Sequence, residues 1–94
     1  MNDRDLLDEL LQVAERLGVE VRMEPFETPA TMGGGLCVVR GEKLVLIDQS
    51  APLPNRVLAL ARALSELESE RVYMLPEARA FIEAIQGNRN PHIE

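Results

Sequence analysis

The sequence predicts an α+β protein, with a first helix, a small and mostly antiparallel three-stranded sheet with a central hairpin, and two C-terminal helices. Three observations predict this class. Apolar residues recur at helical spacing near both ends of the chain, a strictly alternating segment follows the first of these stretches, and two apolar runs flank a glycine in the middle. The 94 residues of the chain are enough for one domain.

The first element is expected to be an amphipathic helix over residues 3–17. Leucines recur there at intervals of three and four, and Asn2 and Gly18 stand where helix caps are found. Residues 19–24 read VEVRME, in which apolar and charged side chains alternate. Such alternation predicts a strand with one face in the core and the other in solvent. Prolines and glycines over residues 25–35 then predict a loop.

Two apolar runs, residues 36–40 and 43–48, predict a hairpin closed by a type II′ turn at Gly41 and Glu42. The expected register pairs Arg40 with Lys43. It places two sets of side chains on opposite faces: Leu36, Val38, Val45 and Ile47, and Cys37, Val39, Leu44 and Leu46. Because both faces are apolar, we expect that helices cover both of them or that a second chain covers one.

The C-terminal part is expected to hold two helices. The second helix is expected over residues 55–68, where Arg62 and Glu66 are spaced to form an ion pair. A connector with an extended stretch follows over residues 70–75. The third helix is expected over residues 76–86, from Pro76 to an end at Gly87. We therefore expect a single domain over residues 1–87 and a flexible tail over residues 88–94.

Charge and composition argue against several functional classes. The net charge is −6, from 16 acidic and 10 basic residues, and the arginines are dispersed along the chain, so no nucleic-acid partner is expected. No apolar run is long enough to cross a membrane, and the N-terminal residues do not form a secretory signal. These features predict a cytoplasmic protein without a membrane partner.

The glycines Gly33, Gly34 and Gly35 are the first chemical candidate, because glycine-rich loops can cradle a phosphate. Phosphate loops lead into a helix, however, whereas these glycines lead into a predicted strand and no GK[ST] motif follows. We interpret them as a flexible start of the hairpin that also lets another backbone approach closely.

Cys37 and Asp48 are the other chemical candidates. Cys37 could be a nucleophile or redox thiol, but the only histidine, His92, lies in the expected tail, so a structural cysteine is favoured. Asp48 ends the hairpin, where a turn or capping residue is favoured. One cysteine and one histidine do not predict a metal site, and no catalytic residue or cofactor is assigned.

The order of elements over residues 1–67 resembles the minimal core of the bacterial ImmA/IrrE-type zinc metallopeptidases. When the AHELGH segment of that family is set against ARALSE, residues 61–66, Arg62 and Glu66 stand where the two zinc-binding histidines would be. Ala63 stands in the place of the catalytic glutamate, so the HExxH motif is lacking. The resemblance therefore implies a degenerate relative, without zinc or peptidase activity, that is retained for binding. The GGLC hairpin also resembles that of other small bacterial proteins.

The leading interpretation is a small non-catalytic bacterial protein that acts through self-association as a homodimer or through binding to another protein. The two apolar faces of the hairpin motivate it. Its interface candidates are Leu36, Val38, Val45 and Ile47. The alternative is a small-molecule-binding domain or an enzyme that uses Gly33 to Gly35, Cys37 and Asp48.

Overall fold

The computed structural model of the chain describes residues 1–26 and 34–89. Its helices are α1 (Asp3–Leu17), α2 (Leu53–Ser65) and α3 (Pro76–Arg89), with a short 3₁₀ helix, η1 (Ser69–Arg71), before α3. Its strands are β1 (Glu20–Glu24), β2 (Gly34–Val39) and β3 (Glu42–Asp48). The predicted α+β class with a central hairpin is confirmed. None of the described helices combines the length and the apolar character needed to cross a membrane.

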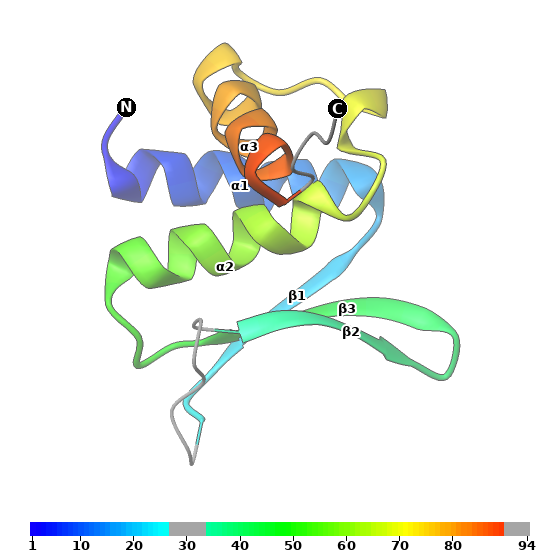
Figure 1. The fold of residues 1–94 in the computed structure, drawn as a ribbon. Coiled ribbons are helices and arrows are strands. Elements are labelled where there is room, and N and C mark those ends of the chain that lie inside the picture. The colour runs from blue at the N-terminus through cyan, green and yellow to red at the C-terminus, as the bar shows by residue number, and fades with distance from the viewer. Residues whose placement is uncertain (27–33, 90–94) are drawn as a thin grey trace.

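The sheet is mixed, with β3 in the middle. β3 pairs in parallel with β1 and antiparallel with β2, so only one of the two pairings is antiparallel. The parallel pairing arises because β1 follows α1 and β3 precedes α2 through short connections, and both strands run back beneath their helices (Figure 1). The sheet is therefore less antiparallel than expected, while its three strands and its hairpin are as predicted.

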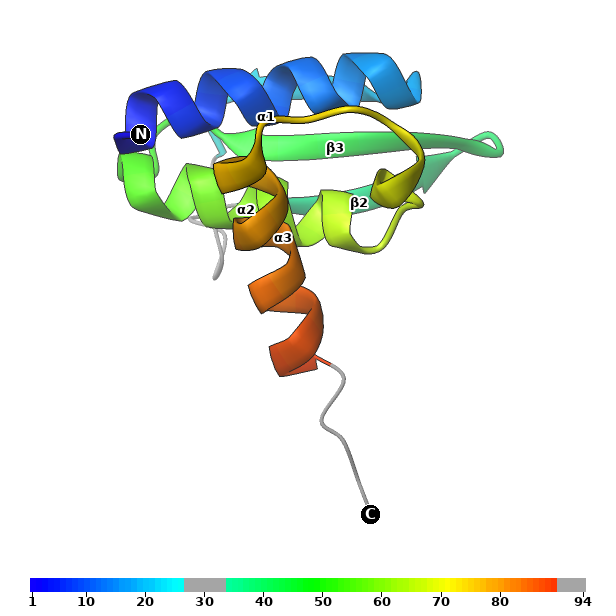
Figure 2. The ribbon, with the colours of Figure 1, turned by 90° about the horizontal axis from the view of Figure 1, so that it is seen from above.

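The elements are stacked in three layers, the sheet, then α1 and α2, then α3 (Figures 1 and 2). α2 packs on β2 and β3, α1 packs on β1, and α3 packs on α1 and α2. The core lies between the sheet and the first two helices, where Leu10, Ile47 and Leu60 have no solvent exposure. Among the described residues, helices thus cover one face of the sheet.

The first helix and the first strand match the sequence prediction closely. The side chain of Asn2 accepts a hydrogen bond from the Asp5 amide at 2.8 Å and caps α1. Gly18 ends the helix with a left-handed φ of 75°, and its own amide bonds to carbonyls of the last turn. β1 then alternates half-buried and exposed residues, as its VEVRME pattern predicted.

The ends of the two later helices differ from the prediction. α2 starts at Leu53, because Pro54 lies in its first turn, where no amide hydrogen is needed. It stops at Ser65, whose carbonyl oxygen accepts a hydrogen bond from the Gln86 side chain of α3 at 3.0 Å. α3 runs through Gly87 to Arg89, so residues 88 and 89 belong to the helix rather than to the expected tail. Residues 90–94 lie outside the described residues.

The hairpin turn lies one residue earlier than predicted. Arg40 and Gly41 form it with φ angles of 53° and 81°, and Val39 pairs with Glu42. Two successive positive φ angles define a type I′ turn, whose twist matches that of the strands, so the predicted type II′ turn was wrong.

The pairing of the two hairpin strands is shifted by two residues as a consequence. Leu36 lies opposite Val45 instead of Ile47, and Cys37 lies opposite Leu44 instead of Leu46. Because side chains alternate with a period of two, this shift leaves every side chain on the face that the sequence predicted.

Candidate functional site

The four interface candidates are divided between the core and the surface. Val45 and Ile47 on β3 are buried beneath the helices. Leu36 is half-buried against the same core, whereas Val38 is 64% exposed. All four side chains are on the helix-covered side, but the hairpin extends beyond the helices at its turn (Figure 2). Val38 is therefore the candidate that a partner could reach most readily.

The other face of the sheet is partly shielded by the charged side chains of β1. Glu20 and Arg22 form an ion pair at 2.9 Å beside Leu44 and Leu46 of β3. The hydrogen bond that Arg22 donates to Glu20, together with the negative charge of Glu20, raises the pKa of Arg22. Leu44 is only 9% exposed, so this face is not a bare apolar patch.

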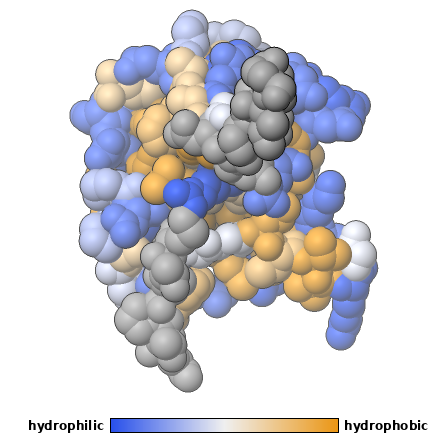
Figure 3. Space-filling view, viewed as in Figure 1, coloured by the Kyte–Doolittle hydropathy of each residue, from blue (hydrophilic) through white to orange (hydrophobic). Residues whose placement is uncertain are grey.

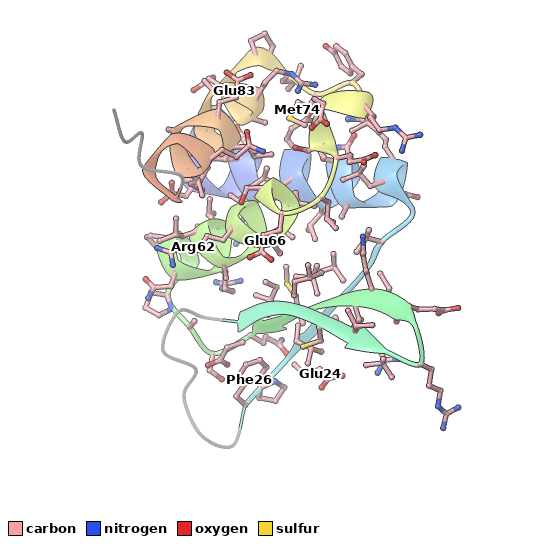
Figure 4. All side chains as sticks on the ribbon, turned by 45° about the vertical axis from the view of Figure 1, so that its right-hand side comes forward. Glu24, Phe26, Arg62, Glu66, Met74 and Glu83 are labelled. Atoms are coloured by element: carbon pink, nitrogen blue, oxygen red, sulfur yellow. The ribbon has the colours of Figure 1, made fainter. Side chains whose placement is uncertain are left out.

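Two residues at the end of β1 complete this second face. Figure 4 shows Glu24 and Phe26 below the sheet, on the side away from the helices. Phe26 is half-buried and Glu24 is exposed.

Apolar exposure is concentrated on the outer strand, β2, near the hairpin turn. Val38 and Val39 are 64% and 50% exposed, one on each face of the sheet. Figure 3 shows hydrophobic surface continuing over the sheet toward a hydrophilic tip. β2 reads GGLCVV, without charge or proline, and no strand among the described residues pairs with its outer edge. An uncharged edge strand of this kind is a template for another strand.

The fold of the single chain requires a glycine at position 34 but not at position 35. Gly34 has a φ of 139°, and a Cβ atom there would overlap the carbonyl oxygen of Leu46 in β3. The predicted close approach of a second backbone is therefore confirmed at Gly34. At Gly35 a Cβ atom would meet no described atom within 4 Å. Gly33 lies outside the described residues.

Asp48 is buried and has a local structural role. One of its carboxylate oxygens, Oδ1, accepts hydrogen bonds from the amides of Ser50 at 2.9 Å and Phe26 at 3.4 Å. The first bond makes a turn after β3, and the second ties the end of β1 to it, so the interpretation as a turn residue is confirmed. Cys37 is half-buried, and His92 lies outside the described residues.

Glu9 on α1 is a buried acid that was not among the residues singled out from the sequence, and it is only 6% exposed. Its Oε2 atom accepts hydrogen bonds from the Leu75 amide at 2.8 Å and from Arg16 at 3.5 Å. Arg16 also donates to the carbonyl of Tyr73 at 3.0 Å. The pair thus fastens the connector before α3 to α1. The helical spacing of the sequence could have indicated that Glu9 is buried, because Glu9 lies four residues before the buried Val13 and so on the same side of α1.

An open hollow of about 390 Å³ lies where the end of α1 meets η1 and the sheet. Its lining includes Leu17 and Lys43, together with Glu68 and Arg71, which form an ion pair at 2.7 Å. The mixed charges of this lining select no particular ligand. Within residues 1–26 and 34–89, no three or more histidine, cysteine or acidic side chains are grouped so that they could hold a metal ion.

The positions that carry the metallopeptidase resemblance lie on α2 and just after it (Figure 4). Ala63 is buried in the core, Arg62 is half-buried, and Glu66 is exposed at the C-cap. The ion pair between Arg62 and Glu66 and the resemblance itself stay predictions. Comparison with models of protein families, with curated proteins and with solved structures finds no match for this chain.

Proposed function

We propose that this chain is a non-catalytic association protein whose working surface is the outer edge of β2 and whose partner is a second copy of the chain. The observation that carries the proposal is the uncharged edge strand with its two exposed valines, Val38 and Val39. Unpaired amide and carbonyl groups along such an edge bind another strand, and the valines add apolar contact area.

The structural roles of Asp48, Gly34 and Glu9 support an association role over catalysis. Asp48 is engaged with two backbone amides, and Gly34 is required by the close contact between β2 and β3. Glu9 is engaged with the Leu75 amide and Arg16. Each of these residues therefore has a structural role that accounts for its burial or its conformation.

The test is the mass of the protein in solution, measured by sedimentation velocity and light scattering over a wide range of concentrations. We expect the mass to rise with concentration toward twice the 10.5 kDa of one chain. A mass of one chain at every concentration would overturn the proposal.

The matched variants are Val38→Glu and Tyr73→Glu. Val38 and Tyr73 are 64% and 67% exposed, and each variant adds one negative charge. Lys43 lies directly opposite Val38 on β3, so the single chain accommodates a glutamate there. We expect Val38→Glu to weaken association at least tenfold, about 1.4 kcal/mol, because a charge on the edge opposes strand pairing. Tyr73→Glu, on the connector before α3, should leave association unchanged.

A further inference from the structure

Gly35 is a strand glycine that the single chain does not explain. Its φ lies outside the left-handed region, and a Cβ atom there would meet no described atom within 4 Å. A glycine inside a strand destabilises it by about 0.5–1 kcal/mol relative to alanine. Such a glycine often marks a place where another chain segment approaches closely.

The hairpin geometry determines which groups of β2 face outward. A two-residue turn is closed by a hydrogen-bonded pair, here Val39 with Glu42, and hydrogen-bonded pairs alternate along an antiparallel ladder. Val39, Cys37 and Gly35 therefore direct their amides and carbonyls toward β3. The intervening residues, Leu36 and Val38 among them, direct theirs to the outer edge.

We infer that two copies of the chain pair their β2 edges antiparallel about a twofold axis, with Cys37 opposite Cys37 of the second copy. This inference rests on the proposed function and specifies its geometry. Leu36 of each copy then exchanges hydrogen bonds with Val38 of the other, and the two sheets become one of six strands. Such a short ladder buries less than a standard interface of about 1,200–2,000 Å², so the dimer is reversible.

Side-chain size favours this register. Val39 of one copy lies opposite Gly35 of the other and covers the backbone that the missing side chain leaves exposed. Val38 lies against Leu36 of the second copy, so both exposed valines gain a neighbour. A second register with similar overlap places Leu36 opposite Leu36 of the other copy. In that register Val39 extends past Gly34, the first residue of the other β2 strand, and has no residue of that strand opposite it.

The distribution of charge also favours a second copy of the chain as the partner of the β2 edge. The paired segments carry no charge, so the ladder brings no like charges together, although each chain has a net charge of −6. The antiparallel arrangement also sets the Arg40 turn of one copy beside the end of the other sheet where Glu24 and Asp48 finish their strands. The turn region carries Arg40 and Lys43 against Glu42 and is net positive, so its charge complements that end.

The test is disulfide cross-linking of the native protein with diamide, read as a covalent dimer on a non-reducing gel. A non-hydrogen-bonded pair has Cα atoms about 4.5 Å apart, which a disulfide can bridge. Two double variants serve for comparison. One combines Cys37→Ser with Leu36→Cys, and the other combines Cys37→Ser with Tyr73→Cys. We expect native Cys37 to cross-link several-fold faster than either of them, because in the proposed register two Leu36 positions are diagonal, about 7–8 Å apart.

Val38→Pro provides a second test that needs no thiol. The Val38 amide points away from β3 in this geometry, so proline keeps the ladder with β3 and the folded chain is retained. Association falls at least tenfold, because the amide that binds Leu36 of the second copy is lost. Faster cross-linking at position 36 than at 37 overturns the register. Dimer mass without preferential cross-linking at either position overturns the edge geometry but leaves self-association standing. A mass of one chain overturns the proposed function itself.

Discussion

Glu9 and Glu15 lie on the same helix, and their surroundings give them different roles. Glu9 is buried against the connector before α3 and accepts the Leu75 amide at 2.8 Å, whereas Glu15 is exposed. A buried acceptor that loses its side chain leaves an amide without a partner, and this has a larger effect on folding than the loss of a solvated charge. The burial of Glu9 depends on where α3 begins, which is a feature of the tertiary structure.

We therefore expect Glu9→Ala to lower the free energy of unfolding by about 1.5–3 kcal/mol. The substitution removes the hydrogen bonds to the Leu75 amide and Arg16. Urea denaturation followed by circular dichroism measures the change. Glu15→Ala is the control, with an expected change within about 0.5 kcal/mol. Equal losses in the two variants would contradict the assigned role of Glu9.

At the scale of the elements, glycines act in opposite ways at the ends of two helices. Gly18 ends α1 in a left-handed conformation with a φ of 75°, which other residues adopt only at a cost. Gly87 lies inside α3, exposed, and a Cβ atom there would meet nothing within 4 Å. The same residue type therefore stabilises one helix end and weakens the other helix.

The substitution of alanine for each glycine is expected to change stability with opposite signs. Gly18→Ala should lower the free energy of unfolding by about 1 kcal/mol, because alanine is strained at this φ. Gly87→Ala should raise it by up to about 1 kcal/mol, because alanine loses less backbone entropy in a helix. Thermal and urea denaturation of both variants give the two values. A loss of stability in Gly87→Ala would mean that α3 does not continue through this residue in solution.

At the scale of the whole molecule, the three-layer stacking leaves β2 at an outer edge of the sheet. α2 covers one face of β2 and β3, and β3 is paired on both sides, so the unpaired backbone groups lie along β2 (Figure 1). If the chain associates through this edge, folding and association are linked, and stability depends on protein concentration.

We expect the midpoint of thermal unfolding to rise by about 3–5 °C for each tenfold increase in protein concentration while the dimer is populated. A tenfold change contributes about 1.4 kcal/mol per dimer, half of it to each chain. Differential scanning calorimetry measures the midpoint. In Val38→Glu the same rise should begin only at concentrations at least tenfold higher, and a native midpoint that stays constant with concentration would speak against association.

Much of the local structure could be predicted from the sequence, because its causes are local. The helical spacing and caps around Asn2 and Gly18 place α1, and the alternation of β1 places its strand faces. The type I′ turn could also have been recognised, since glycine is the usual second residue of such a turn and Arg40 tolerates the first position. The conformational role of Asp48 follows from its place at the end of a strand.

The candidate edge was only partly predictable. The uncharged segment of β2 is visible in the sequence, but an edge strand and a central strand have the same local pattern when both are apolar. Val45 and Ile47 were grouped with Leu36 and Val38 for this reason, although β3 is central and buries the first two residues. Which strand ends at the edge depends on pairing between segments distant in sequence.

The sequence by itself therefore determined the type and order of the elements, the caps of α1 and the face on which each hairpin side chain lies, because these depend on neighbours a few residues away. The tertiary structure alone decided that β1 runs parallel to β3, that Glu9 is buried and that the outer edge belongs to β2. These features arise when distant segments meet, and their free energy comes from contacts that no single window of the chain contains.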